Sequence, residues 1–158
     1  MRDRHQLIQE DYVGYDDYPW RILVICIVQG GVLWPVADIL TEEIFGQFNN
    51  HIEMDEDHFP YAQCDTYDKE LYKLYHILKG TRCNLRKTQE LISMSRDYTL
   101  WNKRYHGDHT RFNIIKDFKG CGVYAQDTWN LFVLEKPCHP ADKLLIKYAK
   151  ENNLYKED

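Results

Sequence analysis

Apolar residues recur along this chain at helical spacing, and no segment alternates apolar and polar residues for long enough to predict a strand. The clearest helix pattern begins at Pro19, a residue that suits the first turn of a helix because its missing N–H would be unpaired there anyway. Residues 20–28 are almost continuously apolar. We therefore expect a central helix that is buried on most sides and ends at the Gln-Gly-Gly sequence of residues 29–31.

The other expected helices are shorter, and apolar residues three or four positions apart mark most of them. They are predicted over residues 7–10, 33–48, 68–78 and 85–95, with a last helix that Pro140 opens. The acidic stretch 49–60 and the polar, aromatic stretch 97–111 lack this spacing, so both are predicted to be connections. The pattern as a whole predicts an all-α fold.

Length and composition favour one compact domain over residues 1–158. The chain has 158 residues and 44% hydrophobic content, which is enough for one sizeable core and little for two. It contains no apolar run of membrane length and no apolar segment after Met1 that would indicate a signal peptide. We therefore expect no membrane partner.

The cysteines indicate a reduced, intracellular protein. There are five, at positions 26, 64, 83, 121 and 138, and no two of them form a Cys-x-x-Cys pair. An odd, scattered set of this kind is unlike a disulfide framework or a zinc site. No metal site is expected from these residues.

Charge is distributed unevenly along the chain. The net charge is −5, yet residues 79–119 contain ten Lys and Arg against four Asp and Glu. A basic segment of this kind can meet phosphates, although a solvated helix face would have the same composition.

The stretch 114–132 combines two helical patterns with a glycine-rich turn. Apolar residues before position 119 suit the last turns of one helix, and Ala125 and Trp129 suit the inner face of the next. Gly120 and Gly122 allow a tight turn between them. Such a hairpin directs backbone N–H groups and the positive end of the second helix to one anion, for which a nucleic-acid phosphate is suited. The same two glycines also occur in ordinary connections between helices.

Several motifs together resemble one known family. They are Leu-Ile-Gln-Glu at 7–10, Tyr-Pro-Trp-Arg-Ile-Leu at 18–23, Leu-Arg at 85–86, Gly120-x-Gly122-x-Tyr124-x-x-Asp127 and His139-Pro140-x-Asp142. In this order they resemble the helix-hairpin-helix DNA glycosylases, and most of all the thymine and uracil mismatch glycosylases related to the catalytic domain of the methyl-CpG-binding glycosylase. The resemblance covers almost the whole chain and is strongest over residues 114–148.

This resemblance implies a monofunctional DNA glycosylase acting in base excision repair. Such an enzyme hydrolyses the N-glycosidic bond of a flipped, mispaired or modified pyrimidine in duplex DNA and leaves an abasic site. The base would be thymine, uracil or a 5-substituted uracil. By resemblance Asp142 is the catalytic carboxylate, while Tyr124 and Gln9 line the base pocket. Tyr124 stands where lyase-active relatives have a Schiff-base lysine, so no lyase activity is expected.

The same resemblance implies where DNA binds. The hairpin residues Lys119, Gly120, Gly122 and Val123 would meet the DNA backbone, together with Gln29 and Gly30 at the end of the central helix. A monovalent cation at the hairpin is the one cofactor that it allows. An iron–sulfur cluster is not expected, because no four-cysteine cluster follows the hairpin. The implied protein is a monomer located with the DNA inside the cell.

Two features depart from the family pattern. Gln29, Gly30 and Gly31 stand where the family usually has a larger polar side chain that fills the gap left by the flipped nucleotide. The link between Gln9 and Pro19 is also longer than expected. Two alternatives therefore stay open: a helix-hairpin-helix DNA-binding protein with weak or no catalysis, and a glycosylase-fold enzyme of DNA thymine modification.

Overall fold

Every regular element in the described part of the chain is a helix. The computed structural model describes residues 7–57 and 72–157, and within these ranges it contains no strand, only one isolated parallel bridge between Cys138 and Tyr155. The prediction of an all-α fold is confirmed.

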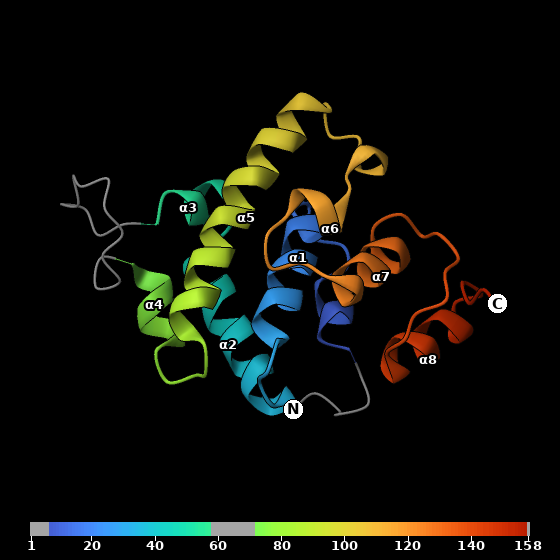
Figure 1. The fold of residues 1–158 in the computed structure, drawn as a ribbon, viewed down its shortest axis with the longest axis horizontal. Helices are drawn as coiled ribbons and strands as arrows, with labels where there is room; N and C mark the ends of the chain where they lie inside the picture. The colour runs from blue at the N-terminus through green and yellow to red at the C-terminus, as the bar shows by residue number, and fades with distance from the viewer. Residues whose placement is uncertain (1–6, 58–71, 158) are drawn as a thin grey trace.

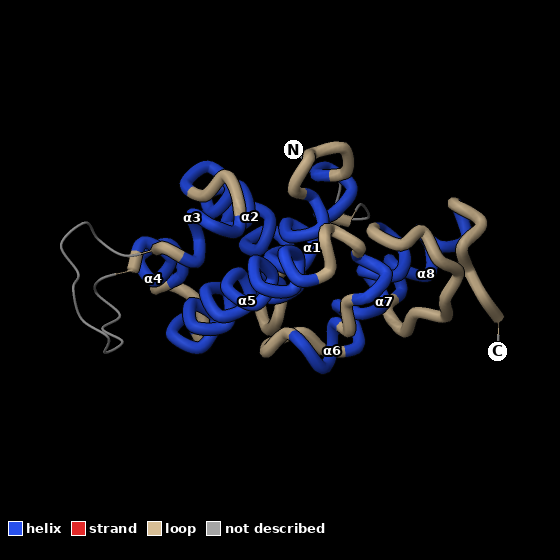
Figure 2. Tube along the Cα trace, turned by 90° about the horizontal axis from the view of Figure 1, so that it is seen from above, coloured by secondary structure: helices blue, strands red, loops and turns tan. Residues whose placement is uncertain are grey.

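The long helix α5 and the buried helix α1 form the middle of the molecule (Figures 1 and 2). Helix α1 spans Tyr18–Gln29 with Pro19 in its first turn, and nearly all its side chains are buried, as its apolar sequence predicts. Helix α5 spans Asn84–Arg104. The indole Nε1 of Trp20 donates a buried hydrogen bond of 3.0 Å to the Ser95 hydroxyl and so fixes the two helices together.

The remaining helices flank this pair on two sides (Figures 1 and 2). On one side lie α2, Trp34–Gln47, α3, His51–Asp55, and α4, Lys73–Leu78. On the other side lie α6, Ile114–Asp117, α7, Val123–Phe132, and α8, Lys143–Glu151. Two 3₁₀ helices, η1 (Ile8–Tyr12) and η3 (His109–Arg111), complete the described elements.

Two apolar clusters stabilise this arrangement. The larger one joins α1 to α2, α5 and α7, with Trp20 and Trp129 fully buried. The smaller one packs α8 against α7 and α1 through side chains that include Leu131 and Leu145. Cys26 on α1 packs against both clusters, so it marks the place where they meet.

Two predicted connections are partly helical, and this corrects the sequence analysis. Residues 51–55 form α3, which Asn50 caps by accepting a hydrogen bond from Glu53 N. Helix α5 continues to Arg104, nine residues beyond its predicted end at 95. The predicted helix at 68–78 is described only from Lys73 onward, because residues 58–71 lie outside the described ranges.

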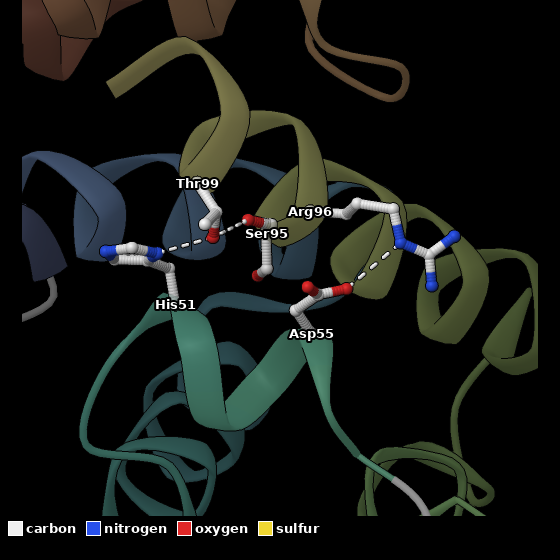
Figure 3. Close-up of polar contacts among 5 residues, drawn as sticks. All are labelled: His51, Asp55, Ser95, Arg96 and Thr99. Carbon is white, nitrogen blue, oxygen red and sulfur yellow. Dashed lines mark hydrogen bonds and ion pairs between the residues drawn. The ribbon is translucent and has the colours of Figure 1, made fainter. Parts of the chain in front are cut away.

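Those two helical segments stabilise each other (Figure 3). The Nδ1 atom of His51 lies 2.6 Å from the Thr99 hydroxyl, and Arg96 Nε donates to Asp55 Oδ1 at 3.0 Å. His51, Asp55, Arg96 and Thr99 are polar, so they do not contribute to an apolar spacing that would predict a helix. The same residues form the contacts between α3 and α5.

The C-terminal residues fix the connection between α7 and α8. Cys138 N donates to Leu154 O and Lys156 N donates to Cys138 O, at 3.0 and 2.8 Å. His139 adds a contact of 3.1 Å between its Nδ1 and Lys156 O, and its ring lies against Tyr155. These contacts join residues 138–139, which precede α8, to residues 154–156, which follow it.

Candidate active site

A cavity of about 330 Å³ lies between the end of α1 and the first turns of α2, α7 and α8. Its position is set by the junction of the two apolar clusters, where Cys26 forms part of the wall. The lining residues come from well-separated parts of the chain: Leu7, Cys26, Gln29, Gly30, Trp34, Tyr124, Asp142 and Leu144.

Most residues predicted to handle the base meet in this cavity. Tyr124 and Asp142, predicted as pocket and catalytic residues, both line it, as do Gln29 and Gly30. Gln9 is completely buried and reaches the group indirectly, because its Nε2 donates a hydrogen bond of 3.0 Å to the Tyr124 hydroxyl. The fold therefore brings together side chains from positions as far apart as 9 and 142.

The wall around Tyr124 is kept neutral. Burial, together with the nearby Cys26 and Asp142, raises the pKa of the Tyr124 phenol, and the Gln9 hydrogen bond only partly opposes this. Burial likewise raises the pKa of the Cys26 thiol to about 12, against opposing hydrogen bonds from Thr128 and Gln9. The second amide atom of Gln9, Oε1, is buried without a hydrogen-bond partner among the described residues.

Asp142 is the exposed carboxylate of the cavity and also the N-cap of α8. Its Oδ2 accepts hydrogen bonds from Leu144 N and Leu145 N, at 3.0 and 3.1 Å. Its Oδ1 accepts none from the described part of the chain. One oxygen is therefore used to fix the side chain, and the other remains able to act on water or a ligand in the cavity.

Asp127 helps to place Asp142. Its carboxylate accepts a hydrogen bond from the backbone of Ala141, the residue directly before Asp142, and burial raises its pKa in spite of that bond. Because Asp127 lies on α7, this contact links the helix that carries Tyr124 to the start of α8.

The predicted hairpin lies between α6 and α7, and its residues Lys119, Gly120, Gly122 and Val123 are exposed. Helix α6 is a single turn, so the hairpin follows a shorter first helix than predicted. No hydrogen bond joins the backbone N–H of Gly122, Val123 or Tyr124 to a described acceptor, and the first such donor is Gln126 N. Unpaired amides at the start of a ten-residue helix can bind an anion.

The two hairpin glycines differ in backbone conformation and in the space around them. Gly120 has φ +89°, which side chains rarely allow, whereas Gly122 has φ −115°. A Cβ at Gly122 would have open space around it, while one at Gly120 would lie 2.7 Å from Glu90 Oε2. Of these two glycines, only Gly120 is therefore required by a positive φ.

Glu90 is a neighbour of the hairpin that the sequence analysis did not single out. It is nearly buried beside Gly120, and Arg86 Nε donates to its Oε1 at 2.9 Å, which balances its charge. Together with Gly30, Gly31 and Gly120, these side chains line a second cavity of about 280 Å³. This cavity shares Cys26 and Gly30 with the first, so the hairpin and the turn after α1 are close neighbours.

Other lining residues of the candidate active site had no distinguishing sequence signal. Cys26 and Trp34 read as ordinary core positions of amphipathic helices, although Cys26 is one helical turn before Gln29 and so shares its face. Leu144 belongs to the apolar face of α8. Only the fold places them beside Tyr124.

Neither a metal cluster nor a membrane span is found in the described ranges. Within residues 7–57 and 72–157, no three His, Cys, Asp or Glu side chains group so that they could hold a metal ion. None of the helices in these ranges has both the length and the apolar composition needed to cross a bilayer. Comparison with models of known protein families and with curated protein sequences gives no match.

Proposed function

We propose that this protein is a helix-hairpin-helix DNA glycosylase that releases a mispaired or modified pyrimidine from duplex DNA and has no lyase activity. The observation that carries the proposal is the cavity in which Tyr124 and Asp142 meet, with Gln9 bonded to Tyr124 behind them. These residues were selected from separate sequence motifs, and a purely accidental resemblance gives no reason for them to share one cavity.

Asp142 supplies the chemistry in this proposal. Cleavage of an N-glycosidic bond develops positive charge on the sugar, and a carboxylate fixed beside it stabilises that charge more in the transition state than in the ground state. Because Oδ2 is held by two backbone amides, the side chain is oriented before substrate arrives. Oδ1 can then orient or deprotonate the attacking water.

Tyr124 and Gln9 form the base-binding wall. The raised pKa of Tyr124 keeps the phenol neutral, so it cannot repel the electron-rich edge of a base. Gln9 Oε1, buried and unpaired among the described residues, is an acceptor that a pyrimidine N–H could satisfy once the base has entered and local side chains have adjusted.

In this proposal, the hairpin and the neighbouring turn after α1 bind the DNA. The unpaired amides after Gly120 suit one backbone phosphate, and exposed Lys119 adds positive charge beside them. The second cavity is lined by both Gly30 and Gly120, so the two segments predicted to bind DNA lie close to each other and to the candidate active site.

The test is the variant Asp142→Asn. Asparagine is as good an N-cap as aspartate, so α8 should stay intact. Release of thymine, uracil or 5-substituted uracil from mismatched duplexes, read out by alkaline cleavage of the abasic site, should fall by at least about a hundredfold, the loss typical of removing one preorganised electrostatic group. Duplex affinity should stay within a few-fold.

The matched control is Asp108→Asn. Asp108 also caps a helix, η3, by accepting from Thr110 N, but it does not line the cavity. This variant should release bases like the parent protein. Full activity in Asp142→Asn would remove this carboxylate from the mechanism.

A second candidate function is duplex binding without base release. The hydrogen bonds that Asp142 accepts from Leu144 N and Leu145 N favour it, because helix capping alone is a sufficient reason for an aspartate at this position. In that case the parent protein binds mismatched duplexes but produces no alkali-sensitive site with any of the three bases.

A further inference from the structure

The wall of the candidate active site contains a hydrogen-bond donor that has no acceptor. Trp34, the first residue of α2, lines the cavity, and its indole Nε1 is buried with no hydrogen-bond partner among the described residues. An indole N–H can only donate, and leaving it unpaired in the interior is unfavourable. A ligand in the cavity that carries an acceptor would remove this penalty.

Two further polar groups at this cavity differ from Trp34 in what they offer. The Oε1 atom of Gln9 is a buried acceptor without a partner among the described residues. The Tyr124 hydroxyl accepts its hydrogen bond from Gln9 Nε2, so its own hydrogen remains able to donate. Trp34, Gln9 and Tyr124 together therefore offer two donors and one acceptor.

This set is complementary to one kind of pyrimidine ring. The edge of a pyrimidine-2,4-dione presents the acceptor O4, the donor N3–H and the acceptor O2, so it needs two donors and one acceptor. A ring with a 4-amino group presents a donor at position 4 and acceptors at N3 and O2. The dione is the ring that satisfies all three groups of the protein.

The position of Asp142 indicates which carbonyl faces Trp34. After burial and Cys26, Asp142 is a further cause of the raised pKa of the Tyr124 phenol, so Asp142 and Tyr124 lie close together. In the proposed reaction Asp142 acts beside the sugar, and O2 is the carbonyl next to the glycosidic nitrogen. Tyr124 therefore meets O2, Gln9 meets N3–H, and O4 is the acceptor that remains for Trp34.

We propose that the indole N–H of Trp34 donates to the 4-carbonyl oxygen of a pyrimidine-2,4-dione and so selects this ring over one with a 4-amino group. This inference rests on the proposed function and names the residue that reads position 4. An amino group there would face the indole N–H, which leaves both donors unpaired. Because Nε1 is buried in the free protein, the indole ring has to turn toward the cavity as the base enters.

The experiment uses free rings, so it does not depend on base release. The probes are 1-methyluracil, in which a methyl group replaces the sugar, and its 4-thio and 2-thio analogues, because sulfur is a weaker acceptor than oxygen. Binding is followed in ¹H–¹⁵N NMR spectra, where Trp34→Phe and Trp129→Phe identify the two indole resonances by their loss. Trp129 is the matched control, since its Nε1 is also buried without a partner among the described residues but does not line this cavity.

1-Methyluracil should move the Trp34 indole proton downfield and leave the Trp129 proton in place. Each thio substitution should weaken binding to the parent by at least about threefold, as expected for one weakened hydrogen bond. Trp34→Phe should bind 1-methyluracil roughly three- to tenfold more weakly and should no longer distinguish the 4-thio ring, while the 2-thio penalty remains. Trp129→Phe should bind all three probes like the parent.

The inference is overturned if the Trp34 resonance does not move at saturating 1-methyluracil, if the parent does not bind this ring, or if the 4-thio penalty is equal in the parent and Trp34→Phe. Should thermal melting show that Trp34→Phe is unfolded, sequential assignment of the parent identifies the indole, and its shift decides. A parent protein that binds 1-methyluracil through Trp34 but forms no abasic site contradicts only the proposed function. Base release without a Trp34 shift contradicts only this inference.

Discussion

At the scale of single residues, the cavity combines one exposed carboxylate with a wall of neutral, partly buried groups. Asp142 is the only acidic side chain that lines the cavity in the described part of the chain, and Tyr124 and Cys26 both have pKa values raised by burial. Chemistry that requires a charged group at this site therefore falls to Asp142. The thiol of Cys26, although it is in the wall, is unsuited to act as a nucleophile at neutral pH.

We predict that Cys26 resists alkylation while the protein is folded. Burial raises its pKa from the ordinary value of 9.0 to about 12, and each unit lowers the thiolate fraction tenfold. At pH 8.5 iodoacetamide should therefore label Cys26 roughly three orders of magnitude more slowly than a free thiol of ordinary pKa. Among the cysteines in the described ranges, peptide mass spectrometry should find exposed Cys83 modified first, and Cys83→Ser should remove the fast phase that it contributes.

The raised pKa of Cys26 also predicts how the free energy of unfolding changes with pH. Because the folded pKa of Cys26 lies above its unfolded value, its contribution to the free energy of unfolding is complete below pH 9 and is lost as pH rises toward 12. Equal labelling rates for Cys26 and Cys83 at pH 8.5 would contradict the raised pKa of the Cys26 thiol.

At the scale of elements, the two glycines of the hairpin differ in what they contribute: Gly120 is needed for folding, whereas Gly122 leaves room for a ligand. Gly120 is required by the backbone, since it has φ +89° and lies against Glu90. Gly122 is not required by the backbone, so a glycine there leaves open space beside the first amides of α7.

We predict that Gly122→Val weakens duplex binding far more than it weakens folding. Valine fits φ −115°, and as an N-cap it should cost about 1–2 kcal/mol at most. Its methyl groups would, however, cover the amides that a phosphate approaches. Gly120→Ala should instead lower the free energy of unfolding by about 1–3 kcal/mol through strain at positive φ.

Thermal melting and duplex titration of the same samples test this pair. Gly46→Val is the matched control, because Gly46 on α2 also has open space for a side chain and lies outside the candidate active site. If Gly122→Val binds DNA as tightly as the parent, the hairpin is only a connection between helices.

The same scale shows how far sequence alone predicts this fold. Apolar spacing located α1, α2 and α8 because each buries a continuous apolar face. It missed α3 and the last turns of α5 because each buries few apolar side chains, Met54 and Tyr98 among them, between polar residues such as the Arg96–Asp55 pair. Motifs selected Tyr124 and Asp142 as candidates, whereas the proximity of Glu90 to Gly120 is seen only in the folded chain.

At the scale of the whole molecule, the charge available to DNA is smaller than the sequence indicates. Of the ten basic residues in 79–119, five make contacts within the protein, although only Arg86 and Arg96 pair with carboxylates. They are Arg86 with Glu90, Lys87 with Val28 O, Arg96 with Asp55, Arg104 with the Trp101 ring and Arg111 with the Tyr105 ring. With a net charge of −5, the protein should depend on a few local phosphate contacts rather than on a broad basic surface.

We therefore predict a shallow but measurable salt dependence of duplex binding. Each neutralised phosphate contributes about −0.9 to the slope of log K against log salt concentration, so about three contacts would give a slope of about −2.7. Lys119→Gln should reduce the magnitude of the slope by about 0.9, because it removes one contact beside the hairpin. Lys136→Gln should leave the slope unchanged, since exposed Lys136 follows the far end of α7, about 15 Å along the helix. The slopes of the parent and both variants are compared by measuring duplex affinity with fluorescence anisotropy from about 50 to about 300 mM salt. An affinity independent of salt, or equal slopes for both variants, would argue against a phosphate contact at Lys119.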